Sequence, residues 1–291
     1  MKCIKCDKKA IISYPVRFCK EHFIEYYLNK LKETIEKWEM FNKDDKILVA
    51  VSGGKDSSSL AYALHLLGYE FEGLYINLEI PNYSNFCEEK VKELFKLINK
   101  KLNIIRVSDY GVKVERVRNR PRCSVCGTIK RYLMNRFAYE NGFTVLATAH
   151  TMPDEVSFFF MNLRSGNLNA IVKQKPVLEG KGKFVKKVKP LIYFTEKENL
   201  TFSLINNLPV CRLECPYAEG NTQNVIKNKI YEIDKDFRGL FNQTIHFLEK
   251  INIEVKDEEV YECIKCGYPT SSKDIVCSFC KIKEYFSKNP S

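Results

Sequence analysis

The chain has 291 residues, of which 45% are hydrophobic and 29% charged, a composition typical of a globular protein and not of a disordered chain. Lysine and arginine outnumber the acidic residues by 47 to 36, and the formal charge of +11 favours a polyanionic partner such as a nucleic acid. No apolar signal peptide opens the sequence, and no apolar run reaches the roughly 20 residues of a membrane span, so we expect a cytoplasmic protein without a membrane anchor.

Cysteines at both ends of the chain have the spacing of structural zinc sites. The first ligand set is Cys3, Cys6, Cys19 and His22, and the second is Cys263, Cys266, Cys277 and Cys280. Ligands in two close pairs suit a four-coordinate zinc ion. Disulfides are the alternative, but a reducing cytosol disfavours them. We therefore predict a zinc finger over residues 1–25 and a zinc ribbon over residues 259–291.

Between these ends, apolar strands alternate with segments of helical periodicity. We predict strands at 46–51, 71–78, 102–107, 143–149 and 184–189, and helices at 57–67, 84–100, 127–141 and 154–163. This alternation predicts an α/β protein with a doubly wound parallel sheet. The core domain is expected to cover residues 26–220, and a helical segment over 221–258 is expected to pack on it.

The first of these strands leads directly into the segment Ser52-Gly53-Gly54-Lys55-Asp56-Ser57. Two glycines allow backbone N–H groups to approach an anion, the following helix offers its N-terminus, and Lys55 adds a positive charge. The spacing does not match a Walker A loop, in which four residues separate the first glycine from Gly-Lys. The alternative is a glycine-rich turn with a surface lysine, and the strand–loop–helix setting favours a nucleotide phosphate site over it.

Another close pair, Cys123 and Cys126, has no second pair nearby, and its plausible partners are Cys211 and Cys215 far downstream. Spacing alone does not identify a metal at such a group. Cys87 stands apart from the other cysteines in the sequence, and we interpret it as a small buried apolar residue.

Basic residues gather in two segments. One contains Arg116, Arg118, Arg120 and Arg122, and the other contains Lys173, Lys175, Lys181, Lys183, Lys186, Lys187 and Lys189. If the arginine segment is extended, its alternation places four guanidinium groups on one side, beside Cys123, where they would suit phosphate contacts. A solvated charged face is the alternative for both segments. We predict RNA binding by the four arginines and by Lys183, Lys186 and Lys187.

The segment Ser52–Ser57 resembles the Ser-Gly-Gly-x-Asp-Ser signature of the PP-loop ATP pyrophosphatases, which have an adenine nucleotide α-hydrolase-like fold. A closer resemblance, over nearly the whole chain, is to the tRNA 2-thiouridine synthetases. It is carried by the terminal cysteine groups, by Cys-Gly-Thr-Ile-Lys-Arg-Tyr at 126–132, by Val-Lys-Pro-Leu at 188–191 and by Glu-Cys-Pro-Tyr at 214–217. The resemblance implies an ATP-dependent tRNA sulfurtransferase: O2 of a uridine attacks the α-phosphate, pyrophosphate leaves, and sulfur then displaces AMP from C2.

The same resemblance implies a [4Fe–4S] cluster held by Cys123, Cys126 and Cys215, with Cys211 as the alternative third ligand. Three thiolates leave one iron of a cubane free to bind hydrosulfide. The expected ATP site comprises Ser52, Gly53, Gly54, Lys55, Asp56, Ser57, Ile76, Asn77 and His150, with the adenine near Ile76 and Asn77. Lys130, one helical turn after Cys126, and Lys55 are candidates for stabilising phosphate charge.

The sequence departs from the family at residues 149–154, where Ala-His-Thr-Met-Pro-Asp stands in place of the more usual Gly-His-Asn-x-Asp-Asp. Pro153 replaces the first carboxylate and suits the first turn of the following helix. Asp154 remains as the candidate for holding Mg²⁺ or orienting the substrate. His150 is interpreted either as a structural residue at the strand end or as a contact to ATP.

Several alternatives stay open on the sequence alone. In place of an iron–sulfur cluster, Cys123 or Cys126 could act as a persulfide or disulfide-forming nucleophile, or the central cysteines could bind a third zinc ion. One alternative function is that of another PP-loop enzyme, such as a 2-thiocytidine synthetase or a ligase without a cluster. The other is that of a non-enzymatic zinc-finger RNA-binding protein. The resemblance also implies a homodimer and a sulfur donor, which is sulfide, a cysteine desulfurase or a ubiquitin-like thiocarboxylate protein. The modified uridine is at position 34 or 54.

Overall fold

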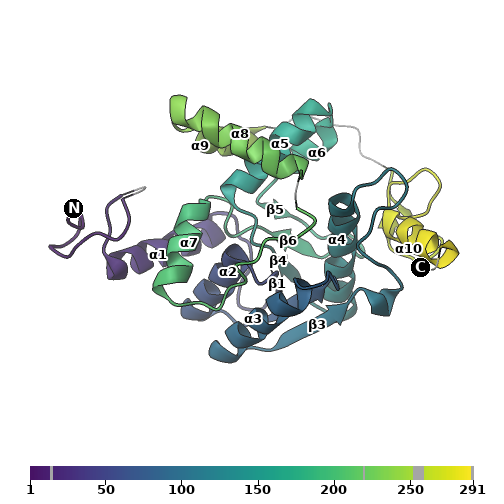
Figure 1. Ribbon diagram of the computed structural model, residues 1–291, viewed down its shortest axis with the longest axis horizontal. Helices are drawn as coiled ribbons and strands as arrows, with labels where there is room; N and C mark the ends of the chain where they lie inside the picture. The colour runs from purple at the N-terminus through teal and green to yellow at the C-terminus, as the bar shows by residue number, and fades with distance from the viewer. Residues whose placement is uncertain (14–15, 219, 252–258, 290–291) are drawn as a thin grey trace.

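A six-stranded sheet lies at the centre of the computed structural model, which describes residues 1–13, 16–218, 220–251 and 259–289 (Figure 1). Its strands are β1 (Ile47–Val51), β2 (Phe71–Asn77), β3 (Leu102–Arg106), β4 (Val145–Ala147), β5 (Val177–Leu178) and β6 (Lys186–Val188), in the order β3-β2-β1-β4-β6-β5. Neighbouring strands are parallel except β5, which pairs antiparallel with β6. The predicted doubly wound parallel sheet is confirmed, and the short antiparallel edge strand is an addition to it.

Helices cover both faces of the sheet. The α-helices of the described residues are α1 (Lys20–Lys37), α2 (Lys55–Leu66), α3 (Ser84–Leu97), α4 (Arg122–Glu140), α5 (Met152–Arg164), α6 (Leu168–Val172), α7 (Glu196–Ile205), α8 (Thr222–Asp236), α9 (Leu240–Lys250) and α10 (Ser278–Lys288). Successive side chains of β1 point to opposite faces: Ile47 and Val49 join the core with α1, α2, α3 and α7, whereas Leu48 joins the core with α4 and α10. A third core joins α5 to α8 and α9.

The sequence analysis did not predict α1 and α7, although both carry a sequence signal. The buried residues Phe23, Tyr27 and Leu31 recur at every fourth position of α1, which is the spacing of one helix face. Thr195 and Glu198 form a capping box at the start of α7. The two helices are joined by Tyr27, whose ring stacks on Phe202 with centroids 3.9 Å apart.

Helix α4 begins at Arg122, five residues earlier than predicted, because Pro121 at the N-cap has an extended backbone. Cys123 and Cys126 therefore lie in the first turns of a helix. Helices α8 and α9 occupy the segment predicted to be helical, but residues 252–258 of that prediction lie outside the described residues. So do residues 14–15, 219 and 290–291 of the other predicted units.

The two terminal cysteine groups lie at opposite ends of the long axis of the molecule (Figure 1). The C-terminal unit contains the small sheet of β7 (Tyr261–Glu262) and β8 (Pro269–Thr270) and packs through α10 on α4. There Tyr132 stacks on Phe279 with ring centroids 3.9 Å apart. Within the described parts of the chain, no helix combines the length and the apolar character that crossing a bilayer requires.

A buried ion pair crosses from α5 to the segment after β6 and yields a stability prediction. Lys189 Nζ lies 2.7 Å from Glu155 Oε2, and the two side chains are 8% and 2% exposed. We expect Lys189→Met to lower the free energy of unfolding by about 3 kcal/mol in urea denaturation, because it leaves a buried carboxylate without its cation. The matched control is Lys229→Met, which breaks an exposed pair with Glu232 and should cost no more than about 0.5 kcal/mol. Equal losses in the two variants would contradict this account.

Candidate active site and metal centres

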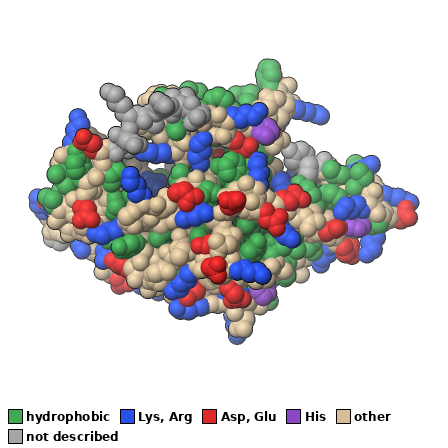
Figure 2. Space-filling model, turned by 180° about the vertical axis from the view of Figure 1, so that it is seen from behind, with side chains coloured by type: hydrophobic (Ala, Val, Ile, Leu, Met, Phe, Trp, Pro, Cys, Tyr) green, Lys and Arg blue, Asp and Glu red, His purple; other side chains and the backbone are tan. Residues whose placement is uncertain are grey.

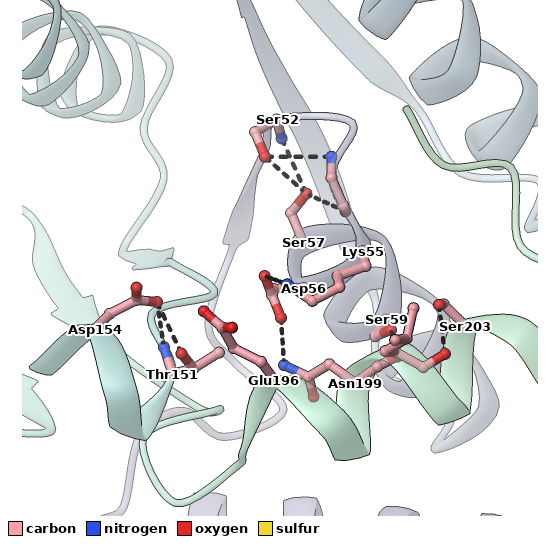
Figure 3. Close-up of polar contacts among 12 residues, drawn as sticks. Ser52, Lys55, Asp56, Ser57, Ser59, Thr151, Asp154, Glu196, Asn199 and Ser203 are labelled. Atoms are coloured by element: carbon pink, nitrogen blue, oxygen red, sulfur yellow. Dashed lines mark hydrogen bonds and ion pairs between the residues drawn. The ribbon is translucent and has the colours of Figure 1, made fainter. Parts of the chain in front are cut away.

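The predicted phosphate loop connects β1 to α2 and is closed by its own serines (Figure 3). The Ser52 N–H donates to Ser57 Oγ at 3.1 Å, and Ser57 Oγ donates to the Gly54 carbonyl at 3.2 Å. The N-terminus of α2 therefore faces the open side of the loop, where its unpaired N–H groups and its dipole favour an anion.

Gly53 is the tightest point of this loop. Its φ is +83°, and a Cβ there would lie 3.0 Å from the Cys87 carbonyl oxygen and 3.1 Å from Cys87 Cβ. The Cys211 N–H donates to the Gly53 carbonyl at 2.7 Å. The loop is thus held from two sides, by α3 and by the segment that leads to Cys215, and glycine is required at this position.

Polar contacts orient the first residues of α2. Lys55 Nζ lies 3.0 Å from Asp56 Oδ2, and Asn199 of α7 donates to Asp56 Oδ1 at 2.8 Å (Figure 3). Burial raises the pKa of Asp56, and the neighbouring Lys55 ammonium opposes that rise. The Asn199 contact was not foreseen from the sequence, because it depends on the packing of α7 against α2.

Asp154 lies beside a second carboxylate, Glu196, as Figure 3 shows. Asp154 Oδ2 accepts the N–H and hydroxyl of Thr151, and its Oδ1 lies 2.6 Å from Lys227 Nζ. The same ammonium lies 2.8 Å from Glu196 Oε1. Burial favours a raised pKa for Asp154, but the Lys227 charge outweighs it and holds that pKa below the ordinary value. Glu196 and Lys227 were missed, since neither belongs to a sequence motif.

His150 is held as a neutral side chain. Its Nδ1 lies 3.0 Å from Thr148 Oγ1, and its ring meets Phe158 edge-on. Burial lowers the pKa of His150 to about 4, and the Lys187 ammonium contributes to this shift. Burial also lowers the pKa of Lys187, to about 8. A neutral imidazole offers a hydrogen bond to a ligand and no charge for phosphate.

The predicted adenine contacts, Ile76 and Asn77, lie at the carboxyl end of β2, and both are buried. The Asn77 amide donates to Glu88 Oε2 at 2.6 Å and to Asn85 Oδ1 at 3.0 Å. This side chain therefore braces α3, and its role in ATP binding stays a prediction.

The three central cysteines converge beside α4. Burial raises the pKa of Cys126, Cys215 and Cys123 raise it further, and Lys130 opposes these effects. Cys123 Sγ donates to the Tyr217 carbonyl at 3.0 Å. Among the described residues, the groups whose ligand atoms all lie within 4.8 Å of one another are the two terminal ones, and the central cysteines are not such a group.

Each terminal group brings together its four predicted ligands. Cys3 Sγ and Cys19 Sγ lie 3.3 and 3.4 Å from His22 Nδ1, and Cys266 Sγ lies 3.7 Å from Cys277 Sγ. Zn–S bonds of about 2.3 Å in a tetrahedron place sulfurs about 3.8 Å apart, so both groups fit zinc. Backbone N–H groups point at the sulfurs as well, for example from Cys277 to Cys263 Sγ at 3.3 Å.

The expectation of an extended arginine segment is wrong. Val117 and Arg120 exchange two backbone hydrogen bonds, and Arg118 has a φ of +52°. The chain therefore turns sharply at Arg118–Asn119 and does not align four guanidinium groups on one side. Arg120 donates to Thr128 Oγ1 at 2.6 Å, whereas Arg122 lies over the Tyr217 ring, 4.7 Å from its centroid.

An open cleft of about 780 Å³ remains beside Cys123, lined in part by Arg116, Arg122 and Tyr217. Two of the three lysines predicted to bind RNA make protein contacts: Lys183 Nζ donates to the Gly267 carbonyl and Lys186 Nζ to the Glu39 carbonyl, each at 2.7 Å. On the face shown in Figure 2, basic and acidic side chains alternate and do not gather into one basic patch.

The sheet, the phosphate loop at its carboxyl edge and the thiol centre beside it define a nucleotide-binding α/β protein of the phosphate-loop type. A sequence model of the PP-loop domain matches residues 23–230. The tRNA-5-methyluridine(54) 2-sulfurtransferase of Pyrococcus horikoshii is 43% identical, over 97% of this chain and 93% of that protein. The chain belongs to the PP-loop family, within its group of tRNA 2-thiolation sulfurtransferases.

Two further relatives widen the comparison. The U34-tRNA thiolase NcsA of Methanococcus maripaludis, solved with its [4Fe–4S] cluster, is 25% identical, with a TM-score of 0.81 over 99% of this chain and 96% of that one. Cytoplasmic tRNA 2-thiolation protein 1 of Aspergillus niger is 27% identical, over 99% of this chain and 89% of that protein.

The depressed pKa of His150 predicts a pH dependence of stability. Between its ordinary value near 6.5 and its folded value of about 4, the unfolded chain binds the proton and the folded chain does not. Stability should therefore fall as the pH is lowered through this window, by at most about 1.4 kcal/mol per pH unit from this residue. Urea denaturation at pH 7 and pH 4.5 measures how much unfolding free energy is lost between the two pH values. We expect this loss to be smaller for His150→Phe than for the unmodified protein. The same loss in both proteins would argue against a neutral His150 ring in the folded chain.

Proposed function

We propose that this chain 2-thiolates a uridine of tRNA, using ATP to activate the base and the central cysteines to deliver sulfur. The observation that carries the proposal is that the phosphate loop is joined to the segment that leads to Cys215, because the Cys211 N–H donates to the Gly53 carbonyl at 2.7 Å. Lys130 of α4 lowers the pKa of Cys126 in the centre and also that of Cys87 behind the loop, so its charge lies within reach of both. A base placed there would meet the α-phosphate and the sulfur source in succession.

The adenylation step follows from the loop. Its N–H groups and the N-terminus of α2 hold the β- and γ-phosphates while O2 of the uridine attacks the α-phosphate. The bond between the α-phosphorus and pyrophosphate breaks, and Lys55 and Lys130 stabilise the negative charge that develops. A sulfur nucleophile then adds at C2, and AMP leaves with the former O2. The target base must be turned out of the folded RNA to reach both groups.

The metal groups are assigned to residues that fit them. Asp154 and Glu196 would hold Mg²⁺, because one oxygen of each carboxylate already contacts the same cation, the Lys227 ammonium. Cys123, Cys126 and Cys215 would hold a [4Fe–4S] cluster, which when bound supplies an iron with a free position for sulfide. The terminal ligand sets would each hold one zinc ion.

We propose the uridine at position 54 as the target, because the relative with 43% identity is named for 5-methyluridine 54. Position 34 is the second candidate, supported by the structural likeness to a U34 thiolase. The cleft with Arg116, Arg122 and Tyr217 would bind the RNA through phosphate contacts and stacking. A cytoplasmic location agrees with the name of the Aspergillus relative. The sulfur donor and a homodimer stay predictions.

The test of this function is a product assay on tRNA. The anaerobically purified protein is incubated with ATP, sulfide and tRNA transcripts in which uridine 54 or uridine 34 has been replaced by cytidine, and the digested nucleosides are analysed by mass spectrometry. We expect 2-thiouridine in the transcript that keeps uridine 54 and none in the transcript that lacks it. Product that depends on uridine 34 would support the second candidate, and no ATP-dependent product would overturn the function.

The cluster assignment predicts the metal content of cysteine variants. The anaerobically purified protein should contain about four irons and about two zincs per chain. Cys123→Ala, Cys126→Ala and Cys215→Ala should each lose iron and keep zinc. Cys211→Ala is the matched control, since it changes a cysteine four residues from Cys215 and should keep its iron. Three zincs without iron in the unmodified protein would contradict the assignment.

A further inference from the structure

Two cysteines outside the proposed cluster meet behind the phosphate loop. Cys87 Sγ of α3 lies 2.7 Å from Cys211 Sγ, although 124 residues separate them in the chain. Cys87 is 1% exposed, and Cys211 is half-buried. Neither residue belongs to the ligand groups found among the described residues. Two sulfurs at this separation are inside their ordinary contact distance, and a disulfide is the bond that a small further approach would form.

The pair is attached to the loop by its backbone. The Cys87 carbonyl and Cβ occupy the space that a side chain at Gly53 would need, and the Cys211 N–H donates to the Gly53 carbonyl at 2.7 Å. A covalent bond between the two sulfurs would therefore join the two segments that contact Gly53 from either side. It would also tie the segment that carries Cys215 to α3, because Cys215 follows Cys211 by four residues.

We propose that Cys87 and Cys211 form a reversible disulfide across the back of the phosphate loop, by exchange with a low-molecular-weight disulfide. The half-buried Cys211 sulfur, as thiolate, attacks the small disulfide, forms a mixed disulfide and releases one thiol. The Cys87 sulfur then gives up its proton and attacks the Cys211 sulfur, and the second small thiol leaves. The two cysteines are oxidised by two electrons, and the small disulfide is reduced to two thiols.

The electrostatic surroundings agree with this order of attack. Burial and the neighbouring Cys211 together raise the pKa of Cys87 to about 12, although Lys130 opposes the rise. A buried thiol of this kind is a poor first nucleophile, but it stands beside the Cys211 sulfur and resolves a mixed disulfide that forms there. The pair is therefore a redox-sensitive clamp on the phosphate loop, and it is separate from the sulfur-transfer reaction.

Peptide mapping tests the proposal without any substitution. The zinc-loaded protein, with and without iron, is incubated with oxidised or reduced glutathione, alkylated and digested with trypsin. Residues 56–90 and 198–212 form tryptic peptides that each contain a single cysteine, Cys87 and Cys211, whereas Cys215 falls in the next peptide. We expect these two peptides to be joined after oxidation and separately alkylated after reduction. Hydrogen exchange of the loop 52–57 should be slower in the oxidised protein.

Variants separate this pair from the cluster cysteines. Cys211→Ser should abolish the linked peptide and the redox dependence of loop exchange, and Cys215→Ser, the matched control, should retain both. The oxidised unmodified protein should also melt several degrees above the reduced protein, a difference that Cys211→Ser should lack. Alkylation of both Cys87 and Cys211 after oxidation would overturn the proposal, as would a link from either residue to Cys123, Cys126 or Cys215.

Discussion

The positive φ of Gly53 is the constraint on which the site depends. At +83° the backbone turns from β1 into α2 in a space that the Cys87 backbone closes on one side. The hydrogen bond from the Cys211 N–H to the Gly53 carbonyl then brings the segment before Cys215 to the same loop. The segment that leads to Cys215 contacts the phosphate loop through the backbone of this one glycine.

The carboxylates near the phosphate loop are paired with other groups of the protein. Asp56 is paired with Lys55 and Asn199, and Asp154 with Lys227, because a buried carboxylate without a partner is costly. His150 remains neutral. A metal ion bound with a triphosphate would therefore compete with Lys227 for the carboxylates of Asp154 and Glu196. Lys227 lies on α8 and contacts both of them. This links the helical unit of α8 and α9 to the state of the site.

Helix α4 connects the thiol centre to the C-terminal ribbon, residues 259–289. Its first turns carry Cys123 and Cys126, and its middle packs through Tyr132 on Phe279, which lies between two ribbon ligands. The ribbon therefore supports the helix that positions the centre, a structural role that requires no contact with RNA.

By itself the sequence determined the features that are local: the strand–loop–helix unit at Ser52–Ser57, the ligand spacing of the terminal cysteine groups and the alternation that predicts a mostly parallel sheet. Spacing and periodicity carry this information because neighbouring residues in the chain must also be neighbours in space. Only the tertiary structure decided which distant groups meet. Lys227 pairs with both Asp154 and Glu196, and Cys87 contacts Cys211. The conformation of the arginine segment was also not predicted from its sequence pattern, since the turn at Arg118–Asn119 is formed by backbone hydrogen bonds and does not depend on the alternation of charge.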